Sequence, residues 1–304
     1  MALFADRLIE KIRAKDSRCV VGLDPRVDQM PEFVRSHGTY AAITAFHELV
    51  IDAVADLVPA VKPQLAFFEQ YGVLGMQAFD NTVRAAKKRG LLVIADGKRN
   101  DISSTAEAYA NAYLSAGEVD RDAGFDCDAL TVTPYLGRDS LVPFVEACKK
   151  HGKGLFVVLK TSNPGSKDFE DQTLAETGRP LYEKIGGVLN ELGASLVGES
   201  GYSSIGAVIG ATFPEEGRRL RTLMPKALIL VPGYGAQGGS AKAAAECFND
   251  DGLGAIVNSS RGITYAFGDP NISRDAFVHS VRENTLRMIA EVNAAVKTPT
   301  AALP

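Results

Sequence analysis

The sequence predicts an α/β protein, a single-domain (β/α)8 TIM barrel. Short apolar runs alternate with longer stretches of helical spacing along all 304 residues, an order typical of parallel strands joined by helices. The runs are apolar at consecutive rather than alternate positions, which indicates strands that are covered on both faces. Eight strand–helix units in a chain of this length fit a closed barrel better than an open, doubly wound sheet.

The predicted strands are eight short apolar runs. They are Cys19–Leu23, Ala60–Lys62, Leu92–Asp96, Ala129–Thr133, Leu155–Leu159, Ile205–Ile209, Leu228–Val231 and Ala255–Asn258. Stretches such as AITAFHELVIDAVADLV and NTVRAAKKRG have helical spacing, and Gly90 at the end of the latter suits a helix C-terminus. The connection from Ser162 to Ser204 is expected to hold a helix and an active-site loop. One domain would span 1–304, with a tail that frays from about residue 293.

Composition and charge argue against several classes of protein. A formal net charge of −4 offers no basic face for nucleic acid. No charge-free apolar run approaches the roughly 18 residues of a membrane span, and charged residues within the first dozen argue against a signal peptide. The four cysteines lack the spacing of a metal site or a disulfide framework. We therefore expect a cytoplasmic protein with reduced thiols that binds neither nucleic acid nor membrane.

Polar residues and glycines follow most of the predicted strands. In a barrel of this class the carboxyl ends of all strands open at one mouth, where the chemistry takes place. The groups at these ends are Asp24, Lys62, Asp96, Lys98, the run TSN at 161–163, PGYGAQGG from Pro232 and NSSRG from Asn258. Unrelated solvated turns are not expected to place a charged or glycine-rich group at so many strand ends. The pattern favours one functional site.

The segment after the seventh strand has the composition of a phosphate-binding loop. LILVPGYGAQGGS contains G-x-G-x-x-G at Gly233, Gly235 and Gly238, which alone is a weak dinucleotide-binding fingerprint. That fingerprint also requires an acidic residue at the end of the next strand, but here Asn258 and then Arg261 follow. A phosphate monoester site between the loops after strands seven and eight fits better. Glycine N–H groups and the guanidinium of Arg261 would hold the phosphate.

The segment LLVIADGKRNDISSTA, residues 91–106, ends a buried strand in a group of charges. Asp96 and Lys98 are two positions apart, so in strand geometry they point to the same side. A lysine flanked by carboxylates remains an ammonium and can donate a proton. The order Lys62, Asp96, Lys98, Asp101 interleaves opposite charges, although Asp101 should not reach the others within its own chain without a tight turn. Because such an array is costly to bury, a purely structural role is not expected.

These residues resemble those of orotidine 5′-phosphate decarboxylases, in particular the longer bacterial subtype. The D-x-K-x-x-D motif of that family stands here as DGKRND, Asp96 to Asp101, followed by Ile102 and Thr105. The other matching residues are Asp24 in VVGLDPR, Lys62 in AVKPQ, Ser162 in KTSNPGS, Gln237 in GYGAQGG with Pro232 and Gly238 beside it, and Arg261 in SSRG. The resemblance extends from about Asp6 to about Val292.

The resemblance implies decarboxylation of orotidine 5′-monophosphate to uridine 5′-monophosphate, the last step of de novo UMP biosynthesis, without a metal or an organic cofactor. Lys98 would protonate C6, Asp96 would lie beside the departing carboxylate, and Lys62 and Asp101 would hold the array in register. The implied substrate-binding residues are Asp24, Thr105, Ile102, Ser162, Pro232, Gln237, Gly238 and Arg261. The resemblance also implies a homodimer in which Asp101 and Thr105 reach the neighbouring active site.

The loop after Ser162 is longer than that of the short subtypes. The resemblance therefore does not identify which residues of SNPGSKDFEDQT close over the base. We interpret Lys160, beside this loop, as the partner of a loop carboxylate.

Two alternatives to the decarboxylase remain. A relative acting on a sugar phosphate, such as a 3-keto-gulonate 6-phosphate decarboxylase or a hexulose-phosphate synthase, would need magnesium. A catalytically silent nucleotide-binding barrel would bind UMP without turnover.

Overall fold

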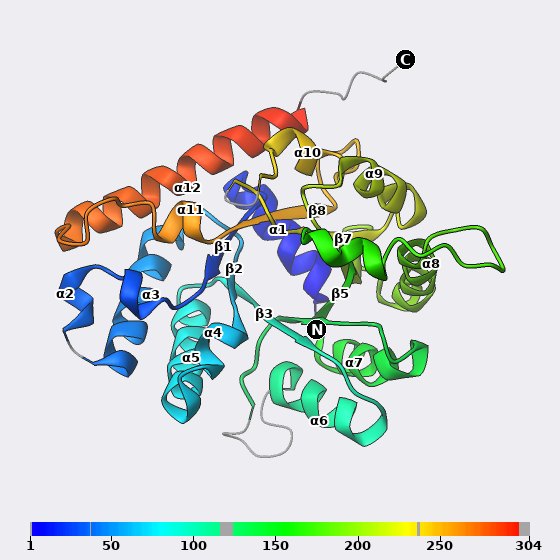
Figure 1. The fold of residues 1–304 in the computed structure, drawn as a ribbon, viewed down its shortest axis with the longest axis horizontal. Helices are drawn as coiled ribbons and strands as arrows, with labels where there is room; N and C mark the ends of the chain where they lie inside the picture. Colours follow the sequence, from blue (N-terminus) through cyan, green and yellow to red (C-terminus); the bar gives the residue numbers. More distant parts are fainter. Residues whose placement is uncertain (1, 37, 116–123, 236–237, 298–304) are drawn as a thin grey trace.

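The computed structural model describes residues 2–36, 38–115, 124–235 and 238–297. Eight parallel strands follow one another in sequence order around a closed barrel (Figure 1), and β8 returns to pair with β1. This confirms the predicted (β/α)8 barrel. The strands are β1 (Cys19–Leu23), β2 (Ala60–Pro63), β3 (Leu92–Arg99), β4 (Ala129–Val132), β5 (Gly154–Lys160), β6 (Ser203–Ile209), β7 (Ala227–Val231) and β8 (Ala255–Ser259).

The main difference from the predicted strand bounds is at β3, which continues to Arg99 instead of ending at Asp96. The register between β3 and β4 shifts between Ala95 and Arg99. Within this irregular stretch Lys98 has a φ of 46°, in the left-handed region, and its N–H donates to Thr131 Oγ1 at 3.0 Å. A non-glycine residue rarely adopts this conformation, so the strand pattern did not predict it.

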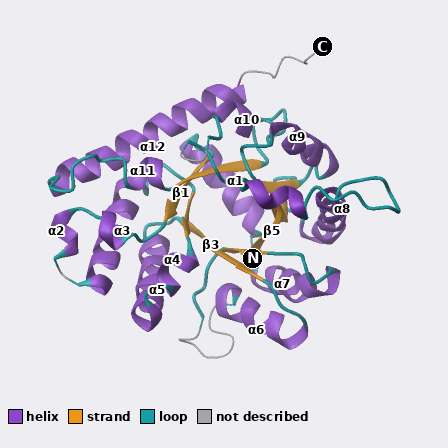
Figure 2. Ribbon diagram, in the orientation of Figure 1, coloured by secondary structure: helices purple, strands orange, loops and turns teal. Residues whose placement is uncertain are grey.

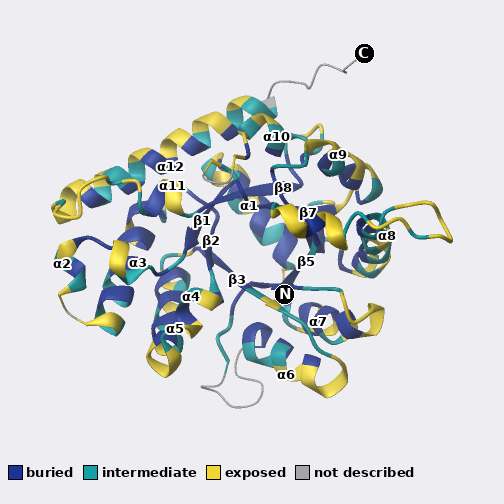
Figure 3. Ribbon diagram, in the orientation of Figure 1, coloured by how far each residue is buried: buried dark blue, intermediate teal, exposed yellow. Residues whose placement is uncertain are grey.

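Helices surround the barrel (Figure 2). The helices of the outer layer are α3 (Thr39–Val54), α5 (Gly72–Lys88), α6 (Ser103–Leu114), α7 (Arg138–His151), α8 (Leu181–Gly193), α9 (Pro214–Leu223), α10 (Ala241–Ala245) and α12 (Arg274–Lys297). Shorter helices in the loops are η1 (Val27–Gln29), α2 (Glu32–Arg35), α4 (Leu65–Glu69), η2 (Pro164–Asp168), η3 (Ala194–Leu196) and α11 (Arg261–Thr264). The helices bury their inner faces against the strands and expose their outer faces (Figure 3). Within the described ranges, none combines the length and apolarity needed to cross a membrane.

Helix α1 (Phe4–Lys15) lies across the N-terminal ends of the strands. Phe4 is fully buried and meets the ring of Phe156 edge-on, with centroids 6.0 Å apart. A Cβ on Gly154 would come within 2.3 Å of the Phe4 ring, so this first position of β5 has no room for a side chain. Arg7 pairs with Asp128, just before β4, at 2.5 Å. These contacts close one end of the barrel.

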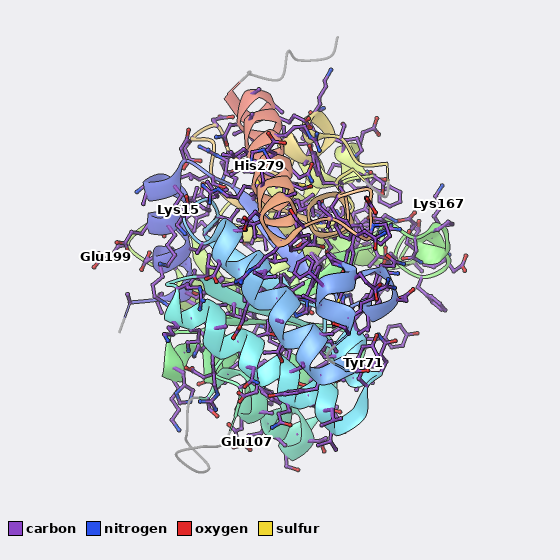
Figure 4. All side chains as sticks on the ribbon, turned by 90° about the vertical axis from the view of Figure 1, so that its left-hand side faces the viewer. Lys15, Tyr71, Glu107, Lys167, Glu199 and His279 are labelled. Atoms are coloured by element: carbon purple, nitrogen blue, oxygen red, sulfur yellow. The ribbon has the colours of Figure 1, made fainter. Side chains whose placement is uncertain are left out.

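The opposite end carries the loops that follow the strands. In the side view of Figure 4, Tyr71 and Lys167 lie at one end of the molecule, and Lys15 and Glu199 lie at the other. Tyr71 and Lys167 belong to the connections after β2 and β5, whereas Lys15 ends α1 and Glu199 precedes β6. The groups predicted at the strand ends therefore share the end of the barrel that faces away from α1.

The C-terminal helix continues past the point where we expected the chain to fray. We expected fraying from about residue 293, but α12 extends to Lys297. Asn293 donates to Asp16 O at 2.7 Å and accepts from Arg18 Nη1 at 2.9 Å, and Val296 packs on the core. Contacts with residues distant in sequence therefore hold the last turns. The rest of the tail lies outside the described residues.

Candidate active site

A pocket of about 580 Å³ lies at the C-terminal ends of the strands. It is lined by residues from the ends of β1, β2, β3, β5, β7 and β8. The predicted site residues in its lining are Asp24, Lys62, Asp96, Lys98, Ser162, Pro232 and Arg261. The barrel thus brings together most of the groups that the sequence placed at separate strand ends.

Asp96 is the centre of the charge array. Its Oδ2 accepts hydrogen bonds from Lys62 Nζ at 2.6 Å and Gln64 Nε2 at 2.8 Å. Its Oδ1 accepts from Lys98 Nζ at 2.7 Å and Thr131 Oγ1 at 2.9 Å. The carboxylate is therefore held between two ammonium groups, as the interleaved charges predicted, and two neutral donors complete its hydrogen bonding.

The charges of this array depend on one another because most of it is buried. Burial by itself would raise the pKa of Asp96, but the ammonium groups of Lys62 and Lys98 outweigh burial and hold that pKa well below its ordinary value. Burial would likewise lower the pKa of Lys62, but the charges of Asp96 and Asp24 raise it above its ordinary value. Asp96 is therefore a carboxylate, and Lys62 an ammonium, throughout the neutral pH range.

Several buried polar atoms of the pocket residues have no hydrogen-bond partner within the described part of the chain. They are Asp24 Oδ1, Arg26 Nε, Ser162 Oγ and Asn258 Oδ1. The guanidinium of Arg26 lies 4.6 Å from the ring centroid of Phe67, at the same pocket. Buried polar groups in folded proteins nearly always have partners. Because their residues line one pocket, that pocket is a candidate site for a polar ligand.

The predicted phosphate end of the pocket lies at β7 and β8. Arg261 begins α11 and lines the pocket with Gly233 and Tyr234. Tyr234 is tied to α12 through a hydrogen bond to Glu291. A Cβ on Gly22 of the neighbouring β1 would lie 1.9 Å from Ser260 Oγ, so only glycine at that position lets the β8 loop approach so closely. Together these residues place backbone groups and a guanidinium around one corner of the pocket.

Gly238 of the predicted phosphate loop is not among the described residues that line the pocket. Gly238 has a φ of 88°, which favours glycine, and its N–H donates to Gly235 O at 2.9 Å. This hydrogen bond closes a tight turn within the loop. Gln237 lies outside the described residues. Gly233 of the same loop does line the pocket, and Gly238 belongs to the turn that follows it.

The residues after the charge array lie away from their own pocket. Asp101 Oδ1 accepts from the N–H of Ile102 at 2.8 Å, and the side chains of Ile102 and Thr105 are exposed. None of the three lines the pocket among the described residues. This agrees with the expectation that Asp101 does not reach the array within its own chain.

Known proteins provide an independent comparison. The sequence model of the "Orotidine 5'-phosphate decarboxylase / HUMPS family" matches residues 18–273. The "Orotidine 5'-phosphate decarboxylase" of Rhodopirellula baltica is 48% identical over 273 residues, which cover 88% of this chain and 89% of that protein. The protein of the same name from Caldicellulosiruptor saccharolyticus is 39% identical and covers 97% of this chain and 100% of its own. The chain belongs to this family.

The fold of the chain is also that of the family's solved structures. The structure of Leishmania donovani OMP decarboxylase superposes with a TM-score of 0.76 at 30% identity, covering 98% of this chain and 100% of that one. The family match begins just before β1 and ends just before α12, so it includes every residue predicted for the site. The resemblance stated from the sequence motifs is confirmed.

Two side chains that contact the charge array were not predicted from the sequence. Gln64 and Thr131 both donate to Asp96. The signal for Thr131 was its hydroxyl in the otherwise apolar, fully buried run ALTV of β4, and Gln64 follows Lys62 by two positions, the spacing of one strand face.

The interpretation of Lys160 is confirmed, because its ammonium lies 2.6 Å from Asp171 Oδ1. All four cysteines are buried, free thiols, as expected.

Replacing Asp96 with asparagine is expected to lower the free energy of unfolding at neutral pH by about 3–5 kcal/mol, because Lys62 would stay buried without the carboxylate that pairs with it. In the wild type the pKa of Lys62 is raised, so its contribution is complete below the ordinary lysine pKa and is lost as the pH rises through the folded value. In the variant the charge of Asp96 no longer opposes the effect of burial, so the pKa of Lys62 should fall relative to the wild type. The stability difference should therefore narrow from neutral to alkaline pH in urea unfolding experiments.

Asp80→Asn is the matched control, because Asp80 forms an exposed i,i+4 ion pair with Arg84 at 2.8 Å on α5. Its effect should stay below about 0.5 kcal/mol and vary little with pH over this range. Equal effects of the two substitutions would show that the charge array does not contribute to stability.

Proposed function

We propose that this protein is an orotidine 5′-phosphate decarboxylase, which converts orotidine 5′-monophosphate into uridine 5′-monophosphate and carbon dioxide in the last step of de novo UMP biosynthesis. The observation that carries the proposal is Asp96 held between Lys62 and Lys98 in the pocket. The name shared by its relatives supports the same activity. The two lysines and the aspartate provide the charges that decarboxylation without an electron sink requires.

The substrate would extend across the pocket with its phosphate at β7 and β8. Arg261 and the loop from Pro232, which includes Gln237 and Gly238, would hold the phosphate. The pyrimidine would lie against Ser162, whose hydroxyl is buried and without a partner in the described chain. The ribose between them would meet Asp24 and Lys62. This orientation places C6 beside Lys98, whose side chain is 44% exposed and therefore accessible from the pocket.

The reaction would proceed by electrostatic stabilisation. The bond between C6 and the carboxylate breaks, carbon dioxide leaves, and the electron pair stays on C6. The ammonium of Lys98 stabilises this charge, donates its proton to C6 and regains a proton from solvent. Asp96 holds Lys98 at 2.7 Å and lies beside the substrate carboxylate, which it repels in the ground state. Neither a metal nor an organic cofactor takes part in this scheme.

We further infer a homodimer in which Asp101 and Thr105 reach the partner's active site. The side chain of Asp101 contacts the amide next to it and not its own array. Ile102 is 49% exposed beside it, and other large apolar side chains are exposed at this end of the barrel, among them Val73 and Leu74. Exposed apolar surface of this kind marks contacts between proteins. A second copy would cover these residues and add a carboxylate to the array.

The remaining inferences follow from the proposed activity. A biosynthetic enzyme of this kind would act in the cytoplasm, with a small-molecule substrate and without nucleic acid or membrane as a partner. The barrel with α1 and α12 would form one domain spanning residues 1–304.

The activity is tested with purified protein and orotidine 5′-monophosphate in the presence of EDTA, followed by the change in ultraviolet absorbance. Turnover is expected to be unchanged by the chelator, because Lys62 and Lys98 supply the positive charge beside the reacting carbon. Activity that disappears on chelation and returns with magnesium would favour an enzyme acting on a sugar phosphate. UMP binding without turnover would indicate a silent barrel.

Arg261→Ala is expected to weaken binding of UMP by about 2–4 kcal/mol, the scale of a lost charge-assisted bidentate contact. The effect should nearly vanish for uridine, which has no phosphate, and isothermal titration calorimetry compares the two ligands. Arg138→Ala serves as the control, because Arg138 pairs with Glu191 on the surface. Equal losses for UMP and uridine would show that Arg261 is structural.

Mixing two inactive variants tests the shared active site. Lys98→Ala and Asp101→Ala should each be inactive as homodimers, whereas a mixed dimer has one site with both residues intact. Random exchange in a symmetric dimer makes about half of the dimers mixed with half of their sites competent, so about a quarter of the wild-type activity should return. Mass spectrometry verifies the exchange. Proven exchange without recovery would mean that the array is completed within one chain.

A further inference from the structure

Lys160, the last residue of β5, is a fully buried lysine outside the charge array. Its ammonium lies 2.6 Å from Asp171 Oδ1, 3.3 Å from Ser166 Oγ and 3.6 Å from Glu170 Oε2. These partners belong to the loop that leaves β5, which includes η2. In Figure 4 this loop, marked by Lys167, projects at the end of the molecule that carries the pocket. The lysine therefore holds the returning part of the loop against the strand from which it started.

Glu170 ties the start of the same loop to its return. Its Oε2 accepts from the N–H of Thr161 at 3.0 Å, and its Oε1 accepts from Thr161 Oγ1 at 2.6 Å. Both carboxylate oxygens are thus engaged by the first residue after β5. We call Lys160, Thr161, Glu170 and Asp171 the β5 clamp.

The residue next to the β5 clamp is Ser162, and β6 fixes it from the other side. A Cβ on Gly210 would lie 2.3 Å from Ser162 Oγ and 3.1 Å from its N. The N–H of Gly210 donates to Lys160 O at 2.8 Å. Ser162 therefore rests directly on the bare Cα of Gly210, while the preceding residue is held by Glu170. Ser162 lines the pocket, and its buried hydroxyl has no partner in the described chain.

The burial of Lys160 needs a reason, because an apolar side chain of the same length would cost less. Removing an ammonium from water costs several kcal/mol, which an ion pair only partly offsets. The aromatic ring of Phe213, whose centroid is 4.4 Å from Nζ, adds a cation–π contact. The ammonium can attract and orient the two loop carboxylates of Glu170 and Asp171, which an apolar side chain could not do. Their position sets that of Thr161 and hence of Ser162.

We propose that Lys160 is a positioning residue for recognition of the pyrimidine: through the β5 clamp it fixes the Ser162 hydroxyl at the base before the substrate binds. The proposal rests on the proposed function, since it takes Ser162 as the contact of the base. The β5 clamp lies at the end of β5, whereas the phosphate end of the pocket lies at β7 and β8. Loss of the clamp should therefore weaken recognition of the base and leave recognition of the phosphate intact.

Lys160→Met tests the proposal, with Lys153→Met as its matched control. Methionine fills similar space, and the carboxylates that remain are 20% and 32% exposed, so water can solvate them. Lys153 is also buried, adjoins the other end of β5 and pairs with Asp126 at 2.5 Å. For Lys160→Met, the affinity for UMP should fall about tenfold while that for ribose 5-phosphate stays within about twofold, as expected for one lost hydrogen bond to the base. Lys153→Met should lower the melting temperature but keep both affinities.

A second variant tests the proposal even if Lys160→Met does not fold. Glu170→Ala releases Thr161 but leaves the ion pair of Lys160 with Asp171, so it should show the same loss for UMP and not for ribose 5-phosphate. In both variants the Thr161 amide should exchange faster with deuterium in the ligand-free protein. Should the ratio of the two affinities stay at its wild-type value in both variants, the positioning role is wrong. A wild-type protein that binds UMP but does not decarboxylate the substrate overturns the proposed function and leaves this comparison valid.

Discussion

One carboxylate between two ammonium groups is the interaction on which this site depends. Asp96 on β3 takes hydrogen bonds from Lys62 on β2, from Thr131 on β4 and from Lys98 on its own strand. These groups meet only when three neighbouring strands are paired in their native register. Asp96 and Lys62 are tolerated in a buried place because opposite charges lie beside them, so the buried charges cannot be assembled one at a time. Formation of the barrel and formation of the charge array are therefore a single event.

Different strand ends around the pocket would bind different parts of the substrate. In the proposed complex, β7 and β8 hold the phosphate, β5 holds the base, and β1 to β3 surround the reacting carbon. The phosphate is the part of the substrate farthest from the chemistry, and its binding energy can be used to orient the base over Lys98. The pocket is also lined by residues whose buried polar atoms, such as Asp24 Oδ1 and Ser162 Oγ, have no partner within the described part of the chain. In the proposed complex, polar groups of the substrate would pair with these atoms.

The parts of the molecule that the sequence predicted are those governed by local pattern. The strands were located because a short, continuous apolar run bounded by glycines and charges is typical of a buried strand. The pocket residues were located because a barrel brings the ends of its strands together at one mouth. The roles of Gln64 and Thr131 depend on a partner more than thirty positions away, and nothing in their own segments specifies it. The same is true of Asn293, which fixes the end of α12 through Asp16. The left-handed conformation of Lys98 likewise follows from its surroundings and not from its type.

The position of α1 has a consequence for synthesis of the chain. Its apolar face, with Phe4 and Leu8 fully buried, packs on strands as late as β6, where the N–H of Ala5 donates to Ser204 Oγ at 3.1 Å. Contacts of such long sequence separation form slowly and only after the distant partner exists. Until β5 and β6 have emerged from the ribosome, the amphipathic helix has no complete surface to cover, and its apolar face stays available to chaperones. Helix α1 thus precedes the barrel in the sequence but is among the last helices to be packed.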